Sequence, residues 1–577
     1  MFHIVCLALT GLAAYRSYEF AINIYQAHRT GLRYVIVPFL ETEIVSQLAT
    51  PVLRWLYTPS LDKGKGWPTW CRFMIKDWSW EDKRIAHDKY GDIFLVVSPM
   101  GIICYVADAD VSWDVLNRRH EFTKPRDKYK ILEPYGPNVA TAEGETYRFH
   151  VRITAPPFSD GSGVNNIVWN ETVMQTKSLM ERWSKAPPAN LHEDVNALTL
   201  AVISLAAFGR KLDSDGANAQ AMPPGYKLSF LCALADTTKY ILQILVFPTW
   251  VLRWSPFARA ALAKKELEKH MLEIIDDEKA ALSERGLKDE SRLGPRGNLV
   301  QSIMKASHQC AQAAPAGKVA SMGRGFSDTE VMGNLWIYLL AGYETTANAI
   351  AYGLIVLALR PDLQQKLAQE IDEVRAKVTA DGRTDMDYKH DFEKLQYCYG
   401  FMYETFRLYP GVTLITKMCK EMQPIDVPVY DKAAAAATKR RVILPAECRV
   451  YLSAPGIHYH PSIWKSPEEL IPERWIAKAA PAEAGEATKK HVVAADRTRQ
   501  MRGSLLTFSD GARSCLGRKF AQAEYIAFLA TLLEQFTVEL APGVDAEQAW
   551  RDLNLKCAGA ITLAPLPIGL ALKRRDM

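Results

Sequence analysis

Hydrophobic residues recur at helical spacing over much of the chain, and the stretch from about residue 165 to 285 is mostly helical in pattern. A long apolar helix is predicted to begin after Ser327, which forms a capping box with Glu330, and to end at Leu359, before Pro361. Two strand-like runs, 93–97 and 102–106, flank a Ser-Pro-Met-Gly turn. Either Asp108 or Asp110 is then expected to cap a helix that reaches Arg119.

The first 62 residues contain two apolar runs with basic residues between them. The run 1–15 is shorter than the roughly 20 residues that a membrane-spanning helix needs, and Pro38 interrupts the run 34–40. We interpret 1–62 as a short membrane anchor with an interfacial segment. A buried N-terminal helix and a cleaved signal peptide are the alternatives. A Gly-rich linker at 63–68 then opens a single catalytic domain, 63–577.

Composition narrows the class of protein. Net charge is only +5 over 577 residues, so composition implies no nucleic-acid partner. The 10 cysteines lack CxxC pairs, which favours reduced thiols in a cytosol-facing protein. The stretch 286–325, rich in Gly, Ser, Ala, Pro and charge, is predicted to include a mobile surface connection. The stretch 477–500 has little apolar bulk, and we expect a disordered surface insertion there.

The chain is organised around a glycine-bearing loop that runs into Cys515 and an apolar helix. We expect Cys515 at the N-terminus of that helix, where free backbone N–H groups and the helix dipole stabilise a thiolate. Gly511 permits a tight turn, and Gly517 leaves room for a large flat group close to the backbone. Phe508 offers an aromatic face on the thiolate side, and Arg513 can reach an anion at the rim. Such a set suits a single soft axial ligand to iron in a flat macrocycle.

The middle of the long apolar helix combines small and polar residues. Ala341 and Gly342 allow close approach of a planar group, and the Thr345 hydroxyl can bond back to the preceding turn and bend the helix. Glu344 is an acid in apolar surroundings, which costs free energy unless it serves a network. A membrane span and a merely kinked core helix are the alternatives, and Glu344 and Asn348 disfavour the first.

These motifs resemble those of the cytochromes P-450. The stretch 508–517 fits the family's haem-binding signature, Phe-x-x-Gly-x-Arg-x-Cys-x-Gly, and 341–346 is similar to its central-helix motif. The resemblance runs from about residue 70 to the C-terminus and implies a mainly α protein with a small β lobe, the cytochrome P-450 fold. It also implies haem b, with Cys515 as thiolate ligand to the iron and with Glu344 and Thr345 in proton delivery.

Further motifs follow the family's order. Glu404-x-x-Arg407 and the later Pro-Glu-Arg474-Trp resemble its ion-pair segments, which implies that Glu404, Arg407 and Arg474 form a buried triad that braces the haem loop. Lys417 matches a position that often binds a haem propionate, and Arg513 should bind the propionates too.

One helix departs from the family's Trp-x-x-x-Arg pattern. Tyr147 replaces the tryptophan and Val151 the basic residue. Arg148, His150 and Arg152 are the candidate substitutes.

The resemblance implies a monooxygenase that hydroxylates or epoxidises a largely apolar organic substrate. No flavin or nicotinamide motif occurs, so electrons are expected from NADPH-cytochrome P-450 reductase, with cytochrome b5 as a candidate second donor. Arg518 and Lys519 are candidates for docking the reductase, or are ordinary solvated cations. The resemblance implies that the protein is located at the endoplasmic reticulum membrane, with its catalytic domain facing the cytosol. It also implies a role in secondary metabolism.

Two other functions stay open at this point. One is a haem-thiolate isomerase, dehydratase or peroxygenase, and the other is a non-catalytic haem ligand-binding protein. The intact pair Glu344-Thr345 argues against both. By resemblance, the substrate pocket should be lined from segments 125–142, 338–345, 412–416 and 559–563. The mostly apolar candidates in these segments are Tyr338, Val412, Leu414, Ile415, Ala560 and Ile561.

Overall fold

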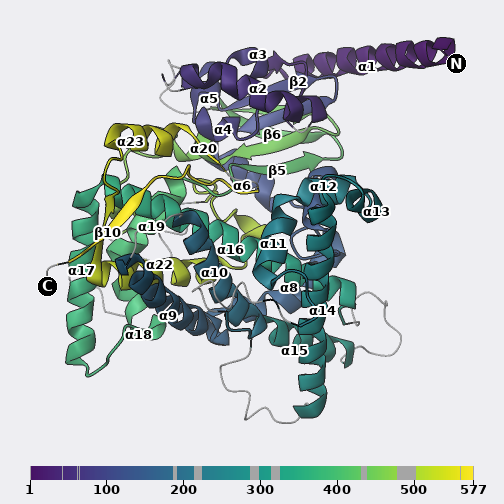
Figure 1. The fold of residues 1–577 in the computed structure, drawn as a ribbon. Coiled ribbons are helices and arrows are strands. Elements are labelled where there is room, and N and C mark those ends of the chain that lie inside the picture. The colour runs from purple at the N-terminus through teal and green to yellow at the C-terminus, as the bar shows by residue number, and fades with distance from the viewer. Residues whose placement is uncertain are drawn as a thin grey trace.

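Helices make up most of the computed structural model, and a small sheet region lies at one end beside the N-terminal helices (Figure 1). The structure describes residues 2–41, 43–61, 63, 65–185, 191–212, 222, 224–285, 298–312, 325–429, 438–476, 502–558 and 561–575. The expected insertion at 477–500 lies outside these residues. This mainly α protein with a small β lobe confirms the predicted fold class.

The main sheet has six strands in the order β1-β2-β3-β8-β5-β4. The predicted hairpin is present, and Ile93 of β2 pairs with Val106 of β3. Both hairpin strands are buried almost throughout, which explains why they appear as continuous apolar runs without alternation. Two further pairs, β6 with β7 and β9 with β10, form separate two-stranded sheets. The strands are β1 Tyr34–Ile36, β2 Ile93–Ser98, β3 Gly101–Val106, β4 Phe122–Thr123, β5 Leu414–Cys419, β6 Gln423–Val429, β7 Thr438–Leu444, β8 Arg449–Ser453, β9 Phe536–Leu540 and β10 Leu570–Arg574.

The long apolar helix, α16 (Asp328–Leu359), runs through the middle of the helical region. Its capping box is present: the Ser327 hydroxyl accepts from the Glu330 amide, and the Glu330 carboxylate accepts from the Ser327 amide. It packs against α10, α19 and α22, and most of its side chains are buried. A helix that is apolar on nearly all sides belongs in the core of a large protein, as observed.

The other helices surround α16 and cover the sheet. Asp108, rather than Asp110, caps α6, which ends two residues before the predicted Arg119. A helix, α15, lies within the predicted surface connection 286–325. The helices are α1 Phe2–Thr30, α2 Ile44–Leu61, α3 Thr69–Arg72, α4 Trp78–Glu81, α5 Ile85–Tyr90, α6 Ala109–Asn117, α7 Arg126–Tyr129, α8 Gly144–Thr154, α9 Val164–Lys185, α10 Leu191–Phe208, α11 Phe230–Lys239, α12 Ile241–Val246, α13 Thr249–Arg253, α14 Ala258–Arg285, α15 Leu299–Gln312, α17 Pro361–Ala380, α18 Tyr388–Asp391, α19 Gln396–Leu408, α20 Ala454–His458, α22 Arg518–Gln535 and α23 Ala546–Leu555.

The N-terminal 62 residues form α1, β1 and α2. The helix α1 projects beyond the body of the protein (Figure 1), whereas β1 pairs in parallel with β2, so part of this segment belongs to the main sheet. Among the described residues, the one helix with the length and apolar composition of a membrane span is α10. Most of α10 is buried against α9 and α16, which is typical of a core helix.

Candidate functional site

The Cys515 loop lies just before α22. The structure places Cys515 two residues ahead of the N-cap, Gly517, so the cysteine directly precedes the N-terminus where the sequence predicted it. The Cys515 amide donates to the Phe508 carbonyl at 2.8 Å, which closes the loop. Burial raises the pKa of the Cys515 thiol, and the Gly517 amide and Arg518 partly offset that rise. The residue is nevertheless exposed at the molecular surface of the described chain.

Gly511 confirms the need for a residue without a side chain in this loop. Its φ is +66°, and a Cβ there would lie 3.2 Å from Asn117 Oδ1 and 3.4 Å from the Leu116 carbonyl. Gly511 thus combines the left-handed conformation with close approach to α6.

The predicted triad is assembled and buried. Glu404 accepts from the Arg407 guanidinium through one oxygen and from Arg474 Nε, at 2.6 Å, through the other. The remaining donors of Arg407 go to backbone carbonyls of residues 458, 467 and 469, at 2.6–2.9 Å. Because both guanidiniums bond directly to the Glu404 carboxylate and Arg407 also bonds to three backbone carbonyls, this cluster serves as a brace.

His458 links the triad to the Cys515 loop. Its Nδ1 lies 2.8 Å from the Arg407 carbonyl, and its Nε2 accepts from the Leu506 amide at 2.9 Å. Burial lowers the pKa of His458 to about 3, so the ring is neutral and can accept that bond. Phe508 packs edge-on against Phe406 of α19, with 5.4 Å between ring centroids. The loop is therefore positioned from α19 and α20.

The centre of α16 is open on one face only. Ala341 is exposed and Thr345 is half-buried, although most of their neighbours on the helix are buried. The Thr345 hydroxyl donates to the Ala341 carbonyl at 2.7 Å, as expected for a threonine that bonds back by one turn. Gly342 differs from its expected role: a Cβ there would lie 2.9 Å from Ile203 of α10, so its small size serves helix packing.

A cluster of cations lies beside the Cys515 loop. Lys417 on β5 is 2% exposed, and burial lowers its pKa to about 8. Burial, helped by Arg513 and Lys417, lowers the pKa of Lys124 to about 7. Arg513 pairs with Glu143 at 2.9 Å, but its Nη1 is buried and has no hydrogen-bond partner in the described part of the chain. Three cations near one carboxylate leave two positive charges uncompensated when all three are protonated.

The comparisons with known proteins decide the family. The family model described as Cytochrome P450 matches residues 69–563. The chain belongs to the cytochrome P450 family. It is 50% identical to "Cytochrome P450 monooxygenase prx9" of Penicillium rubens, over 97% of this chain and 95% of that protein. It is 22% identical to "Phomenoic acid biosynthesis cluster cytochrome P450 monooxygenase" of Leptosphaeria maculans, over 94% of this chain and 93% of that one.

A crystal structure of a cytochrome P450 shares the fold, with a TM-score of 0.61 at 21% sequence identity, over 86% of this chain and 94% of that one. The chain is therefore a cytochrome P450 monooxygenase, an enzyme whose haem is bound through an iron–thiolate bond from a cysteine.

The residues of this cytochrome P450 fit that haem. Haem b carries two propionates, which match the two uncompensated positive charges of Lys124, Lys417 and Arg513. The buried, unpartnered Nη1 of Arg513 is a donor suited to a carboxylate. Cys515 and Ala341 are both exposed, so both can contact a bound group.

Lys124 was not predicted from the sequence, and the three substitutes proposed for Val151 stay predictions. Arg148 and Arg152 are exposed, and His150 is buried near Glu330 and Asn334 of α16. Tyr147 supports Arg513 instead, because its ring lies 3.4 Å from the guanidinium carbon. The one local signal for Lys124 was a cation immediately before the segment 125–142, which was expected to line the pocket.

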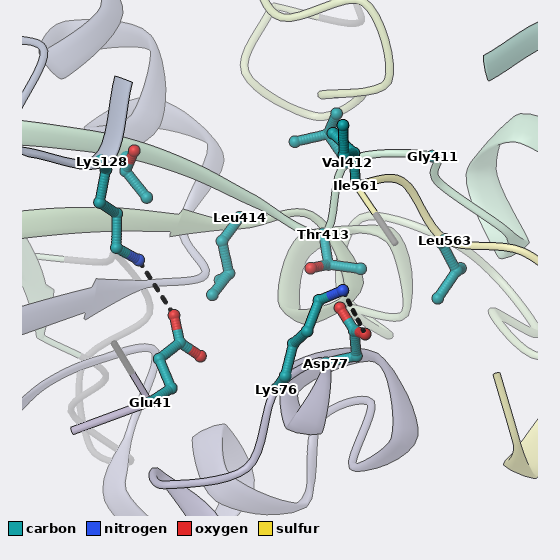
Figure 2. A pocket seen from close by; sticks show the side chains of 11 residues that line it. Glu41, Lys76, Asp77, Lys128, Gly411, Val412, Thr413, Leu414, Ile561 and Leu563 are labelled. Atoms are coloured by element: carbon teal, nitrogen blue, oxygen red, sulfur yellow. Dashed lines mark hydrogen bonds and ion pairs between the residues drawn. The ribbon is translucent and has the colours of Figure 1, made fainter. Parts of the chain in front are cut away.

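A cavity opens between the N-terminal segment and the start of β5 (Figure 2). Val412, Leu414 and Ile561, three of the residues predicted to line the substrate pocket, line this cavity. Ile415 instead packs into the core on the opposite face of β5, and Tyr338 is buried against Phe158. The remaining candidate, Ala560, lies outside the described residues.

The opposite wall of this cavity is charged. Lys128 pairs with Glu41 at 3.1 Å, and Lys76 pairs with Asp77 at 3.8 Å. The cavity thus has an apolar side and a polar rim, which is the usual character of a small-molecule site.

Proposed function

We propose that this monooxygenase hydroxylates or epoxidises a largely apolar organic substrate, with Cys515 as thiolate ligand and Lys124, Lys417 and Arg513 on the haem propionates. When bound, haem supplies the chemistry of oxygen activation. The observation that carries the proposal is the open face of α16 at Ala341 and Thr345, with the buried acid Glu344 next to Thr345 in the helix. In this arrangement the Glu344 carboxyl and the Thr345 hydroxyl hold and pass protons within an otherwise apolar site.

Electrons are proposed to come from NADPH-cytochrome P-450 reductase, with cytochrome b5 as a second donor. Arg518 and Lys519 support this, because both side chains are exposed at the start of α22, close to Cys515. Lys519 lies 3.7 Å from Asp160, a surface contact that a partner could replace at little cost.

The substrate is proposed to belong to secondary metabolism. The name of the Leptosphaeria relative, which places that protein in a biosynthetic cluster, supports this. Val412, Leu414, Ile561 and Leu563 give the cavity an apolar surface suited to a terpenoid, polyketide, alkaloid or fatty-acid skeleton.

The endoplasmic reticulum membrane is the proposed location, with residues 1–62 as the attachment segment and the catalytic domain facing the cytosol. Exposed tryptophans support membrane contact: Trp55 on α2 is 78% exposed, and Trp254, next to α13, is 91% exposed. Tryptophan favours the interface between lipid and water. Flotation of the full chain with liposomes tests this, and Trp55→Ser with Trp254→Ser should reduce it.

Isotope labelling tests the catalytic proposal directly. Deleting the protein from its host and comparing metabolites should reveal a compound that accumulates. The purified holoenzyme, with reductase, NADPH and ¹⁸O₂, should add one labelled oxygen atom to that compound. Product formed without NADPH and reductase would instead favour an isomerase, dehydratase or peroxygenase.

Thr345→Ala tests the proton-delivery role. Loss of the hydroxyl should divert electrons from product to hydrogen peroxide, because a positioned proton donor typically contributes about 10²-fold or more to a step. Peroxide released per NADPH oxidised measures this, and Thr345→Ser should restore the normal ratio. An unchanged product yield in Thr345→Ala would contradict the role.

A further inference from the structure

The carboxylate of Glu344 is held by a residue from a distant part of the chain. Thr562 donates to Glu344 Oε1 twice, from its amide at 3.1 Å and from its hydroxyl at 2.9 Å. Glu344 is only 8% exposed, and its Oε2 is buried without a hydrogen-bond partner among the described residues. One carboxylate oxygen is therefore fixed, and the other is left available.

Thr562 is itself fixed by α16. Asn348, one turn after Glu344, donates from Nδ2 to the Thr562 hydroxyl at 2.9 Å. The side-chain oxygen of Asn348, Oδ1, lies 2.6 Å from His192 Nε2. His192 Nδ1 lies 3.1 Å from Asn196 Nδ2. A hydrogen bond from Asn348 directs the hydroxyl proton of Thr562 toward the carboxylate, because the Thr562 oxygen accepts one bond and donates the other.

The loop that carries Thr562 also borders the cavity. Its neighbours, Ile561 and Leu563, line the cavity in Figure 2, and the Leu563 amide donates to the Gly411 carbonyl at 2.9 Å. Successive residues of this loop thus contact the cavity and the acid of α16.

We propose that Thr562 is a positioning residue for Glu344, which it holds by Oε1 so that Oε2 remains free to transfer a proton. The inference rests on the proton-delivery role proposed for Glu344 and extends it to the loop 561–563. Contact between a substrate and Ile561 or Leu563 would act on the same loop, which links occupancy of the cavity to the orientation of the acid.

Hydrogen exchange of the holoenzyme tests the contact without reference to turnover. Thr562→Val removes the hydroxyl at nearly constant volume, and Thr562→Ser keeps it. Loss of one hydrogen bond to a charged group should increase the exchange rate at the amide of residue 562 about tenfold. We expect that increase in Thr562→Val and not in Thr562→Ser. Thr537→Val is the matched control, since the Thr537 hydroxyl donates to the Lys573 carbonyl on the surface, its one hydrogen bond among the described residues.

Peroxide release tests the positioning role in the same preparations, with reductase and NADPH and no added organic compound. Thr562→Val should raise peroxide per NADPH toward the Thr345→Ala value, and Thr562→Ser should restore the wild-type ratio. If Thr562→Val fails to fold, Thr562→Ala is measured in its place, because it also lacks the hydroxyl. Faster exchange with an unchanged peroxide ratio would overturn the proposal and leave Thr562 as a loop anchor only.

The two proposals fail in different ways. A wild-type protein that lacks a sulfur-type carbon monoxide spectrum would contradict the proposed function, while the exchange data would still report on the Glu344–Thr562 contact. Unchanged exchange in Thr562→Val, with a normal spectrum, would contradict the positioning role alone.

Discussion

Two clusters of charged residues lie near the Cys515 loop, and they differ in how their cations are paired with carboxylates. In the triad, Glu404 holds Arg407 and Arg474, and backbone carbonyls take the remaining donors of Arg407. In the other cluster, Lys124, Lys417 and Arg513 share one carboxylate, and burial pushes two lysine pKa values down to about 7 and 8. In the first cluster both guanidiniums bond directly to the carboxylate, whereas in the second, among the described residues, Arg513 alone pairs with Glu143, so the second cluster can accept an added anion.

This difference separates structural charges from ligand-binding charges. A buried charge is costly to leave unpaired, so lysines whose pKa burial lowers and that lack an ion pair in the described part of the chain indicate a missing partner of opposite sign. It follows that a substitution in the triad should act on folding, whereas one in the cation cluster should act on haem.

The largest effect is expected from Glu404→Ala. Removing the carboxylate leaves two buried guanidiniums without a counter-charge, at a cost on the order of 3–5 kcal/mol in the free energy of unfolding. Thermal and denaturant unfolding measure this. Glu473→Ala, which breaks the exposed pair with Lys366 next to Arg474, should cost about 1 kcal/mol or less. Equal losses of stability in the two variants would contradict the structural role of the buried triad.

Lys124→Met should act on haem affinity more than on the fold. Loss of a charge-assisted bond to a propionate should weaken haem binding by about 2 kcal/mol near neutral pH. Haem titration of the haem-free protein measures it. Lys420→Met, which removes an exposed cation just after β5, is the control and should bind haem normally. Unaltered haem affinity in Lys124→Met would remove this lysine from the site.

The depressed lysine pKa values also predict a pH dependence. Without haem, Lys124 and Lys417 lose protons above about pH 7 and pH 8. Propionates favour the charged lysines, with Arg513 and Glu143 as the other charges of the cluster, so haem binding takes up protons and weakens as pH rises through this window. The haem-free protein should gain stability from pH 7 to roughly 10, because the unfolded chain retains those protons. A flat haem affinity across this range would contradict the assignment.

The smallest effect is expected from surface cations that already lie in water. Arg518→Glu with Lys519→Glu should slow reduction by the reductase about tenfold at low ionic strength, and much less in high salt. Stopped-flow reduction measures this, with Lys420→Glu as the control. The carbon monoxide spectrum should not change. A salt-independent loss would indicate damage to the Cys515 loop instead of an effect on docking.

Local patterns in the sequence were enough to predict several features. The Ser327–Glu330 capping box, the 93–106 hairpin and the turn at Gly511 depend on neighbouring residues only, and all are present. The triad came from a resemblance to the family, and the structure brings its members together.

Contacts between distant segments could not be predicted. Lys124 joins Arg513 only through folding, and Thr562 reaches Glu344 across more than 200 residues. Gly342 appeared to make room for a cofactor, but the close crossing of α10 at Ile203 explains it. A small residue indicates that something lies close to it, and the sequence does not say what.

The account depends most on the bond between Cys515 and haem iron. The carbon monoxide difference spectrum of the reduced protein tests this bond directly, on the wild type, Cys515→Ser and Cys232→Ala. We predict the red-shifted band of sulfur ligation in the wild type and in Cys232→Ala, and its loss in Cys515→Ser. A wild type without that band, or a Cys515→Ser variant that keeps it, would contradict the account.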